Sequence, residues 1–496
     1  MASDKGVVMA TSGRKGKAKA PGTSEPAGGN VEPGRGFGTR IGFILAAIGS
    51  AVGFGSIARF PMNAANNGGA MFLITYGAIM VLFGIPLMIS EFSMGRSAQR
   101  NTVGAFPVLT QNSKTQWKGA GYLYFILAAF ILSYYAILSG WTLRFFFGSL
   151  TGAYFDDGVR DAYVAETTEG PTALLWHAVV MVLTALVLTT PISKGIEKVN
   201  LFMMPALYLI IIGLAIYAAT LPNVADGYEF YLSPSADAFT LPVFTAAVGQ
   251  AFFSLSLAQG AMMIYSSYLS KQSSLASNSM IISFSTLTFA TMCGFMIFPL
   301  LSTFGLLNTG QAGLGLIFGP LAQAFAGLGS PTGNIVGAFF FLATFFASFT
   351  SAVSLMEPAV AYVTEERKID RRRASILVAA LIYIAGIAVA FSSDLLDLEG
   401  GQITDIAIIV GGITIALFVG WYTPKDVAIA RMDEAEGKAL RLGRLVYPWM
   451  RWVMPIVLSV LLVFALLGTP CFLSGDAASV GLIERLGGPG LAGCDG

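Results

Sequence analysis

A run of small polar residues at positions 347–351, Ala-Ser-Phe-Thr-Ser, spaces oxygen atoms in a way that suits a cation. Positions 347, 350 and 351 follow the i, i+3, i+4 pattern, so in a helix one carbonyl and two hydroxyls lie on the same face. Hard, neutral oxygen ligands suit a hard cation such as Na⁺, by the reasoning that applies to calcium and magnesium. Alternatively, each hydroxyl bonds only to the carbonyl of the preceding helical turn. Taken alone, the run favours this second interpretation.

Two further runs combine glycine with polar side chains inside apolar stretches. Residues 49–56 are Gly-Ser-Ala-Val-Gly-Phe-Gly-Ser, and residues 254–260 are Ser-Leu-Ser-Leu-Ala-Gln-Gly. Such runs allow close helix packing, or they break a helix and free its amides and carbonyls to bind a molecule. A break is tolerated in lipid only where it lines a cavity. Because the runs occupy matched positions in two halves of the chain, we favour paired helix breaks around the midplane site of a secondary transporter.

The composition indicates that these polar runs lie within membrane-spanning helices. Of the 496 residues, 55% are hydrophobic and 11% are charged, whereas a soluble protein has about 25% charged residues. The apolar content is enough for about ten to twelve spans of roughly 20 residues. A net charge of +1 argues against a nucleic-acid binder. One histidine and three scattered cysteines give no metal cluster or nucleophile pair, so we expect no enzyme.

Eleven apolar stretches are expected to form the spans, and alternate loops rich in Lys and Arg place the N-terminus in the cytoplasm. The odd number of spans places the C-terminus outside. Residues 1–36 are predicted to be a disordered cytoplasmic tail, and residues 471–496 an extracytoplasmic tail. The stretches lie near 38–62, 68–93, 119–147, 172–191, 199–220, 240–268, 276–306, 333–363, 374–392, 403–422 and 448–470.

Several motifs in these stretches resemble the neurotransmitter:sodium symporter family over about residues 37–422. The resemblance implies an all-α polytopic membrane protein with the fold of the bacterial leucine transporter. That fold has two inverted five-helix repeats, here 37–220 and 240–422, followed by an eleventh helix at 448–470. The motifs are Thr39-Arg40, residues 49–55, Arg59-Phe60-Pro61, Asn67-Gly68-Gly69, residues 84–87 with Glu91, Met94-Gly95-Arg96, residues 192–198 and residues 249–257.

The resemblance also implies an amino-acid site between the two breaks. Monoamine members carry aspartate at the position of Gly53, so glycine there leaves room for a carboxylate from the substrate. That carboxylate would meet the amides around Gly53 and Gly55 and the Tyr135 hydroxyl. A buried amide such as that of Gln259 needs a hydrogen-bond partner. The partner is either the side chain of the substrate or only the neighbouring backbone. The ammonium would meet carbonyls near Ala51, Phe253, Ser254 and Ser256, and the walls would be Ser50, Ile131, Phe253, Gln259, Ala352 and Leu355.

Two sodium sites follow from the same resemblance. In site two, the carbonyls of Gly49, Val52 and Ala347 would join the hydroxyls of Thr350 and Ser351. Site one would combine the carbonyl of Ala51 with the side chains of Ser56, Ser254 and Thr286. Family members typically have asparagine at positions 56 and 286. Because serine is shorter, we expect site one to be weak or filled through water.

The sequence leaves chloride dependence open. Tyr76, Gln250 and Ser254 resemble the chloride ligands of eukaryotic members. Chloride-independent bacterial relatives carry a carboxylate at the position that aligns with Ala290. Alanine supplies neither that acid nor the serine of the eukaryotic members.

Charged residues near the span ends resemble the family's gates. Arg59 needs an acidic partner this close to the membrane core, and Asp405 and Glu399 are both candidates. Glu91 is expected to bond the freed amides of the sixth helix, whereas Glu357, another intramembrane acid, matches no family role. The inner gate would comprise Glu365, Tyr268 and Arg35, with Phe37 in place of a tryptophan.

We therefore expect a sodium-coupled symporter of the plasma (inner) membrane that imports an amino acid by alternating access. Its partners would be the amino acid, Na⁺ and the bilayer. A transporter-like sensor and a channel-like member of the same fold are the alternatives. The sequence leaves open which amino acid is carried, the sodium stoichiometry and the oligomeric state.

Overall fold

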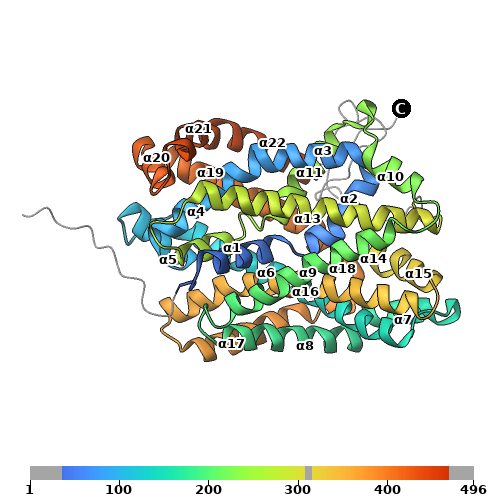
Figure 1. Ribbon diagram of the computed structural model, residues 1–496. Coiled ribbons are helices and arrows are strands. Elements are labelled where there is room, and N and C mark those ends of the chain that lie inside the picture. Colours follow the sequence, from blue (N-terminus) through green and yellow to red (C-terminus); the bar gives the residue numbers. More distant parts are fainter. Residues whose placement is uncertain (1–35, 308–314, 468–496) are drawn as a thin grey trace, which may run out of the picture.

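The computed structural model describes residues 36–307 and 315–467, and these residues form helices and no strands. The helices run roughly alongside one another in a bundle, with α5 and α20 at one end and α7, α10 and α15 at the other (Figure 1). The predicted all-helical class is confirmed. The tails at 1–35 and 468–496, and with them Arg35, lie outside the described residues.

Apolar length explains why these segments are helical, since a helix satisfies every backbone polar group within lipid. The first predicted stretch is a bent pair, Arg40–Ala51 and Gly55–Asn66. The sixth consists of α11 (Leu241–Ser254) and α12 (Ala261–Ser267). The other nine are continuous segments that are long and apolar enough to cross a membrane: Ala70–Ala98, Lys118–Thr151, Pro171–Leu188, Ile196–Ala218, Leu275–Thr303, Thr332–Glu366, Arg371–Phe391, Ser393–Tyr422 and Gly443–Leu467.

The tenth span begins at Ser393, ten residues before the predicted start at position 403. The prediction treated the acidic residues between 394 and 399 as part of a loop. They instead form the helix α18 (Ser393–Leu398) and the following π-helical turn Glu399–Ile403. Glu399 therefore lies within the span and not before it.

Short helices between the spans were not predicted. They lie at the two ends of the bundle, where sequence periodicity is weak over fewer than four turns. They are α5 (Thr102–Thr110), α7 (Asp157–Thr168), α10 (Ala225–Leu232), α14 (Gly315–Phe318), α15 (Pro320–Gly327) and α20 (Lys425–Asp433).

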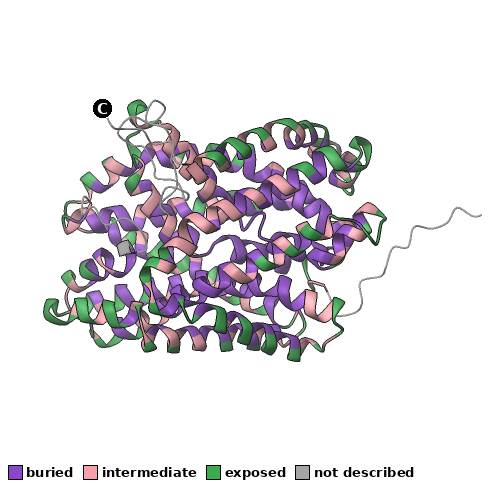
Figure 2. Cartoon of the chain, turned by 180° about the vertical axis from the view of Figure 1, so that it is seen from behind, coloured by how far each residue is buried: buried purple, intermediate pink, exposed green. Residues whose placement is uncertain are grey.

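The centre of the bundle is built on α6 (Lys118–Thr151) and α16 (Thr332–Glu366), which pack against each other along their length. The helix α1 (Arg40–Ala51) packs on α16. Buried residues concentrate in the middle of the bundle, and exposed residues follow the outer helices and the ends (Figure 2). Exposed apolar side chains such as Leu209 and Ile384 lie on those outer helices, as expected for surfaces that face lipid.

Candidate functional site

The first helix break lies at residues 52–54, between α1 and the π-helical turn Gly55–Arg59. The two halves of the span are bent by 50°. The amide of Phe54 has no helical partner and donates to the Tyr135 hydroxyl at 2.8 Å. A Cβ at Gly53 would overlap that hydroxyl and the Oγ of Ser351. Position 53 must therefore be glycine, because any side chain there would collide with Tyr135 and Ser351.

The second break spans residues 255–260, between α11 and α12. Ser256, Ala258 and Gly260 all have positive φ angles, so the chain cannot continue as a helix. The buried carboxylate of Glu91 accepts from the amides of Ala258, at 3.0 Å, and Met263, at 3.1 Å. The predicted role of Glu91 is confirmed: it satisfies amides that the break removes from helical bonding.

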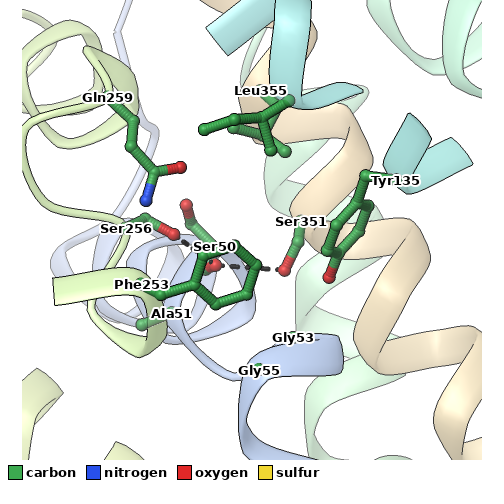
Figure 3. Close-up of a pocket in the computed structure, with 11 residues that line it drawn as sticks. Ser50, Ala51, Gly53, Gly55, Tyr135, Phe253, Ser256, Gln259, Ser351 and Leu355 are labelled. Carbon is green, nitrogen blue, oxygen red and sulfur yellow. Dashed lines mark hydrogen bonds between the residues drawn. The ribbon is translucent and has the colours of Figure 1, made fainter. Parts of the chain in front are cut away.

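The two breaks face each other around one cavity (Figure 3). The Ser256 hydroxyl donates to the Ser50 carbonyl at 2.7 Å and so links the second break to the first. The cavity measures about 10 Å³, roughly the space of one water molecule. All eleven lining residues are uncharged: Ser50, Ala51, Gly53, Gly55, Ile131, Tyr135, Phe253, Ser256, Gln259, Ser351 and Leu355.

Ten of these eleven residues are among the predicted substrate ligands and walls. Predicted Ser254 and Ala352 do not line the cavity, whereas Ser351 does. Ser351 and Leu355 are one helical turn apart on α16, so they share a face from which Ala352 is turned away. The Nε2 atom of Gln259 is buried and has no hydrogen-bond partner in the described residues.

Four of the five oxygens predicted for sodium site two lie close together between α1 and α16, and the part of the Val52 carbonyl stays a prediction. Thr350 Oγ1 lies 2.8 Å from the carbonyl oxygen of Gly49 on α1, and 3.0 and 3.1 Å from those of Phe346 and Ala347 on its own helix. Ser351 Oγ lies 3.2 Å from each of the carbonyl oxygens of Gly49 and Ala347. Both hydroxyls thus reach across to another helix, which back-bonding within α16 alone would not produce. Two rotatable hydroxyls and two carbonyls form a neutral, hard donor set that fits Na⁺.

The side chains predicted for sodium site one make a weaker set. Ser56 Oγ is buried and has no hydrogen-bond partner in the part of the chain that the structure describes. Thr286 Oγ1 donates to Ile282 O of its own helix at 2.9 Å, and Ser254 Oγ accepts from Gln250 Nε2 at 2.7 Å. Both contacts lie within the side chain's own helix, whereas Thr350 and Ser351 of site two also contact α1.

The residues that resemble chloride ligands are also largely engaged. Gln250 Nε2 donates to Ser254 Oγ and to the Gly55 carbonyl, both at 2.7 Å. An amide nitrogen has two N–H donors, so neither remains for an anion in this conformation. The Tyr76 hydroxyl is buried next to Ser254 and makes no hydrogen bond of good geometry within the described residues.

Arg59 forms an ion pair beside the cavity. Its Nη2 lies 2.7 and 2.6 Å from the two carboxylate oxygens of Asp405, which identifies Asp405 and not Glu399 as its partner in this conformation. The guanidinium also lies over the ring of Phe253, 4.8 Å from the centroid. Because Phe253 lines the cavity, the ion pair lies next to the cavity wall that this ring forms.

We predict that Arg59→Ala impairs transport more than substrate binding. Removing one partner of a buried ion pair costs about 3–5 kcal/mol, and less for this pair, which is partly exposed. A double-mutant cycle with Asp405→Ala should be non-additive, whereas the matched cycle with Glu399→Ala should be additive. Equal transport rates in wild type and Arg59→Ala would remove Arg59 from the gate.

A second, largely buried ionic network lies at the end of α12. The Tyr268 hydroxyl donates to Glu357 Oε1 at 2.6 Å, and Arg371 bonds both oxygens of Glu357 at 3.0 and 2.7 Å. Phe37 packs edge-on against Tyr268. The network joins α12, α16 and α17 (Arg371–Gly386).

This network is a contact that the expected inner gate did not include; because Arg35 lies outside the described residues, the gate of Glu365, Tyr268 and Arg35 stays a prediction. Tyr268 was expected beside Glu365, but it bonds Glu357, which lies two turns deeper on α16. Glu365 instead accepts from the backbone and side-chain nitrogens of Asn101, at the start of α5. The sequence signal for this network was the acid at position 357 itself, because a carboxylate inside an apolar span needs a partner.

Comparison with known proteins gives consistent matches. The model of the sodium:neurotransmitter symporter family matches residues 35–169 and 153–471. The uncharacterized sodium-dependent transporter YhdH of Bacillus subtilis is 31% identical over 448 residues, covering 86% of this chain and 96% of YhdH. An uncharacterized sodium-dependent transporter of Methanocaldococcus jannaschii is 34% identical over 371 residues, covering 70% of this chain and 73% of that protein. The crystal structure of MhsT in complex with L-phenylalanine superposes with a TM-score of 0.77 at 34% identity, covering 86% of this chain and 98% of that one.

Proposed function

Since the chain belongs to the sodium:neurotransmitter symporter family and has the leucine-transporter fold, we propose that it imports an amino acid together with Na⁺ by alternating access. Sodium-dependent transport through a multi-pass membrane protein follows from the family. The amino acid as substrate and the roles of the individual residues are the proposal. We further propose that the N-terminus is cytoplasmic and the C-terminus outside, from the charge of the loops.

One observation carries the choice of substrate: the cavity between the two broken helices is lined by uncharged residues. A cationic amine would find no counter-charge there, and an isolated buried charge is strongly disfavoured. A zwitterion brings both charges itself. Its carboxylate would lie at the amides near Gly53 and Gly55 and at the Tyr135 hydroxyl. Its ammonium would lie at carbonyls such as that of Ala51. MhsT was crystallised with an amino acid, L-phenylalanine, which supports this choice.

Gln259 supports a narrower proposal. Its amide nitrogen lies at the cavity and has no partner in the described residues, so a bond from this atom to neighbouring backbone is not seen. A buried donor without an acceptor costs about 1–3 kcal/mol. We propose that the substrate side chain supplies a hydrogen-bond acceptor to Gln259.

The proposed alternating access depends on two groups of residues, one on each side of the cavity. We propose that the Arg59–Asp405 pair closes the outer side in this conformation and that the network of Tyr268, Glu357 and Arg371 closes the inner side. The cavity is also too small for an amino acid, so the helices around it must move for binding. Na⁺ supplies a positive charge that α1 and α16 would hold jointly through Gly49, Ala347, Thr350 and Ser351. Sodium binding would thereby favour one arrangement of these two helices.

Paired ligands test the substrate class. An amino acid should bind the purified protein at least about a hundredfold more tightly than its decarboxylated amine, because each lost bond to a charged group costs about 1.5–3 kcal/mol. Among amino acids, those with a side-chain acceptor should bind better than aliphatic ones of equal size, and Gln259→Leu should remove that preference. Equal binding of amine and amino acid would refute the zwitterion argument. Tight binding without counterflow in liposomes would instead indicate a sensor.

A further inference from the structure

A second cavity, of about 530 Å³, opens at the start of α6, at the end of the bundle where α5 lies (Figure 1). One wall is the face of α5 formed by Val103, Gly104, Pro107 and Val108. The opposite wall combines the start of α6 with the end of α16. Since α6 and α16 are both spans, their ends lie where the membrane meets water.

Three cationic side chains surround this cavity: Arg100, Lys118 and Arg367. Among the described residues, none of the three forms an ion pair with a carboxylate. The one acid in the lining, Glu366, accepts from Asn101 Nδ2 at 3.0 Å. The lining has three cations and one carboxylate, and a second carboxylate, Glu365, accepts from the same Asn101 amide, so the lining itself carries an excess of positive charge.

Aromatic rings line the cavity where it borders α6 and α16. Tyr122 and Tyr362 line it, with ring centroids 5.8 Å apart, and Phe125 stacks on Tyr362 at 4.8 Å. Arg367 lies over the ring of Tyr362, 6.0 Å from its centroid. Tyrosine favours the level of lipid headgroups, because its ring is apolar and its hydroxyl is polar.

We propose that this cavity binds an anionic phospholipid of the leaflet on that side. The phosphate would lie among Arg100, Lys118 and Arg367, and an acyl chain would follow the apolar face of α5 and the tyrosines. Basic pockets between transmembrane helices are known to hold anionic headgroups. The combination of cations, apolar wall and interfacial depth matches a lipid better than a soluble anion, which would need no apolar wall. A lipid here would join α5, α6 and α16, which also carries the sodium-site hydroxyls and Glu357.

The test is a titration of the purified full-length protein with phosphatidylglycerol, followed by native mass spectrometry. Each basic residue near an anionic headgroup strengthens binding about fivefold, so the triple variant Arg100→Ala, Lys118→Ala and Arg367→Ala should bind on the order of a hundredfold more weakly. The charge-preserving variant Arg100→Lys, Lys118→Arg and Arg367→Lys should bind like wild type. Phosphatidylcholine binding should not change in either variant.

A matched control removes Lys194, Lys198 and Arg372, which are exposed basic residues outside the cavity. This variant should keep wild-type affinity for phosphatidylglycerol. Wild-type affinity in the cavity variant, or an equal loss in the control, would overturn the proposal. So would displacement of phosphatidylglycerol by millimolar inorganic phosphate, since the site would then recognise the phosphate alone.

Discussion

Replacing Thr350 by Val and Ser351 by Ala should abolish sodium-driven uptake at physiological sodium concentrations. The two substitutions remove both hydroxyls that contact the Gly49 carbonyl and leave only backbone oxygens for the ion. A bond to a charged group contributes about 1.5–3 kcal/mol, so losing two should raise the sodium concentration for half-maximal uptake by on the order of a hundredfold or more. Uptake by proteoliposomes at increasing external sodium measures this directly.

The matched controls are Ser56→Ala and Thr286→Val, which change the hydroxyls of predicted site one. Thr286 Oγ1 contacts a carbonyl of its own helix, whereas Thr350 and Ser351 also contact the Gly49 carbonyl of α1, so we expect a much smaller effect. This asymmetry predicts one tightly coupled sodium ion and a second that is weak or absent. A Hill coefficient near two that Ser56→Ala reduces to one would show that site one is functional. Unchanged sodium dependence in the Thr350 and Ser351 variant would rule out site two.

Glu91→Ala should destabilise the protein and eliminate substrate binding. The substitution leaves the amides of Ala258 and Met263 buried without their acceptor. Each unsatisfied buried donor costs about 1–3 kcal/mol, so the second break should lose about 2–6 kcal/mol. Ser256, which links the two breaks through Ser50, would lose its position as a consequence. Thermal unfolding in detergent and ligand binding measure the two effects.

Glu91→Gln is the control with the same shape. Glutamine keeps one carbonyl oxygen as an acceptor but places an N–H₂ group opposite the other amide, so an intermediate loss is expected. If Glu91→Ala melts at the wild-type temperature and binds ligand normally, the break does not depend on this carboxylate.

The two helix breaks were predictable from sequence because they depend on local chemistry. The glycines around position 53 and the serines near position 256 interrupt otherwise apolar helices, and a membrane tolerates such interruptions only around a cavity. The spacing of Thr350 and Ser351 likewise placed both hydroxyls on one helix face. Most of the cavity lining follows from these local patterns combined with the family resemblance.

Contacts between distant segments were less predictable. The sequence showed that Arg59 needs an acidic partner. The choice between Asp405 and Glu399 depended on the position of the tenth span, whose first turns lay outside the predicted stretch. The sequence placed the charged side chain of Glu357 inside a span. It did not indicate that Arg371 and Tyr268 would be its partners. In each case the residue type showed that a partner was needed, and the tertiary fold determined which one.

Concentrative uptake tests the central claim most directly. Proteoliposomes containing the purified protein should accumulate a labelled amino acid above its external concentration when an inward sodium gradient is imposed, and should not do so with potassium in its place. The Thr350 and Ser351 variant, reconstituted at equal density, should lose this accumulation. If no member of a panel of all twenty amino acids accumulates under the sodium gradient, while the protein remains folded, the chain is not a sodium-coupled amino-acid symporter.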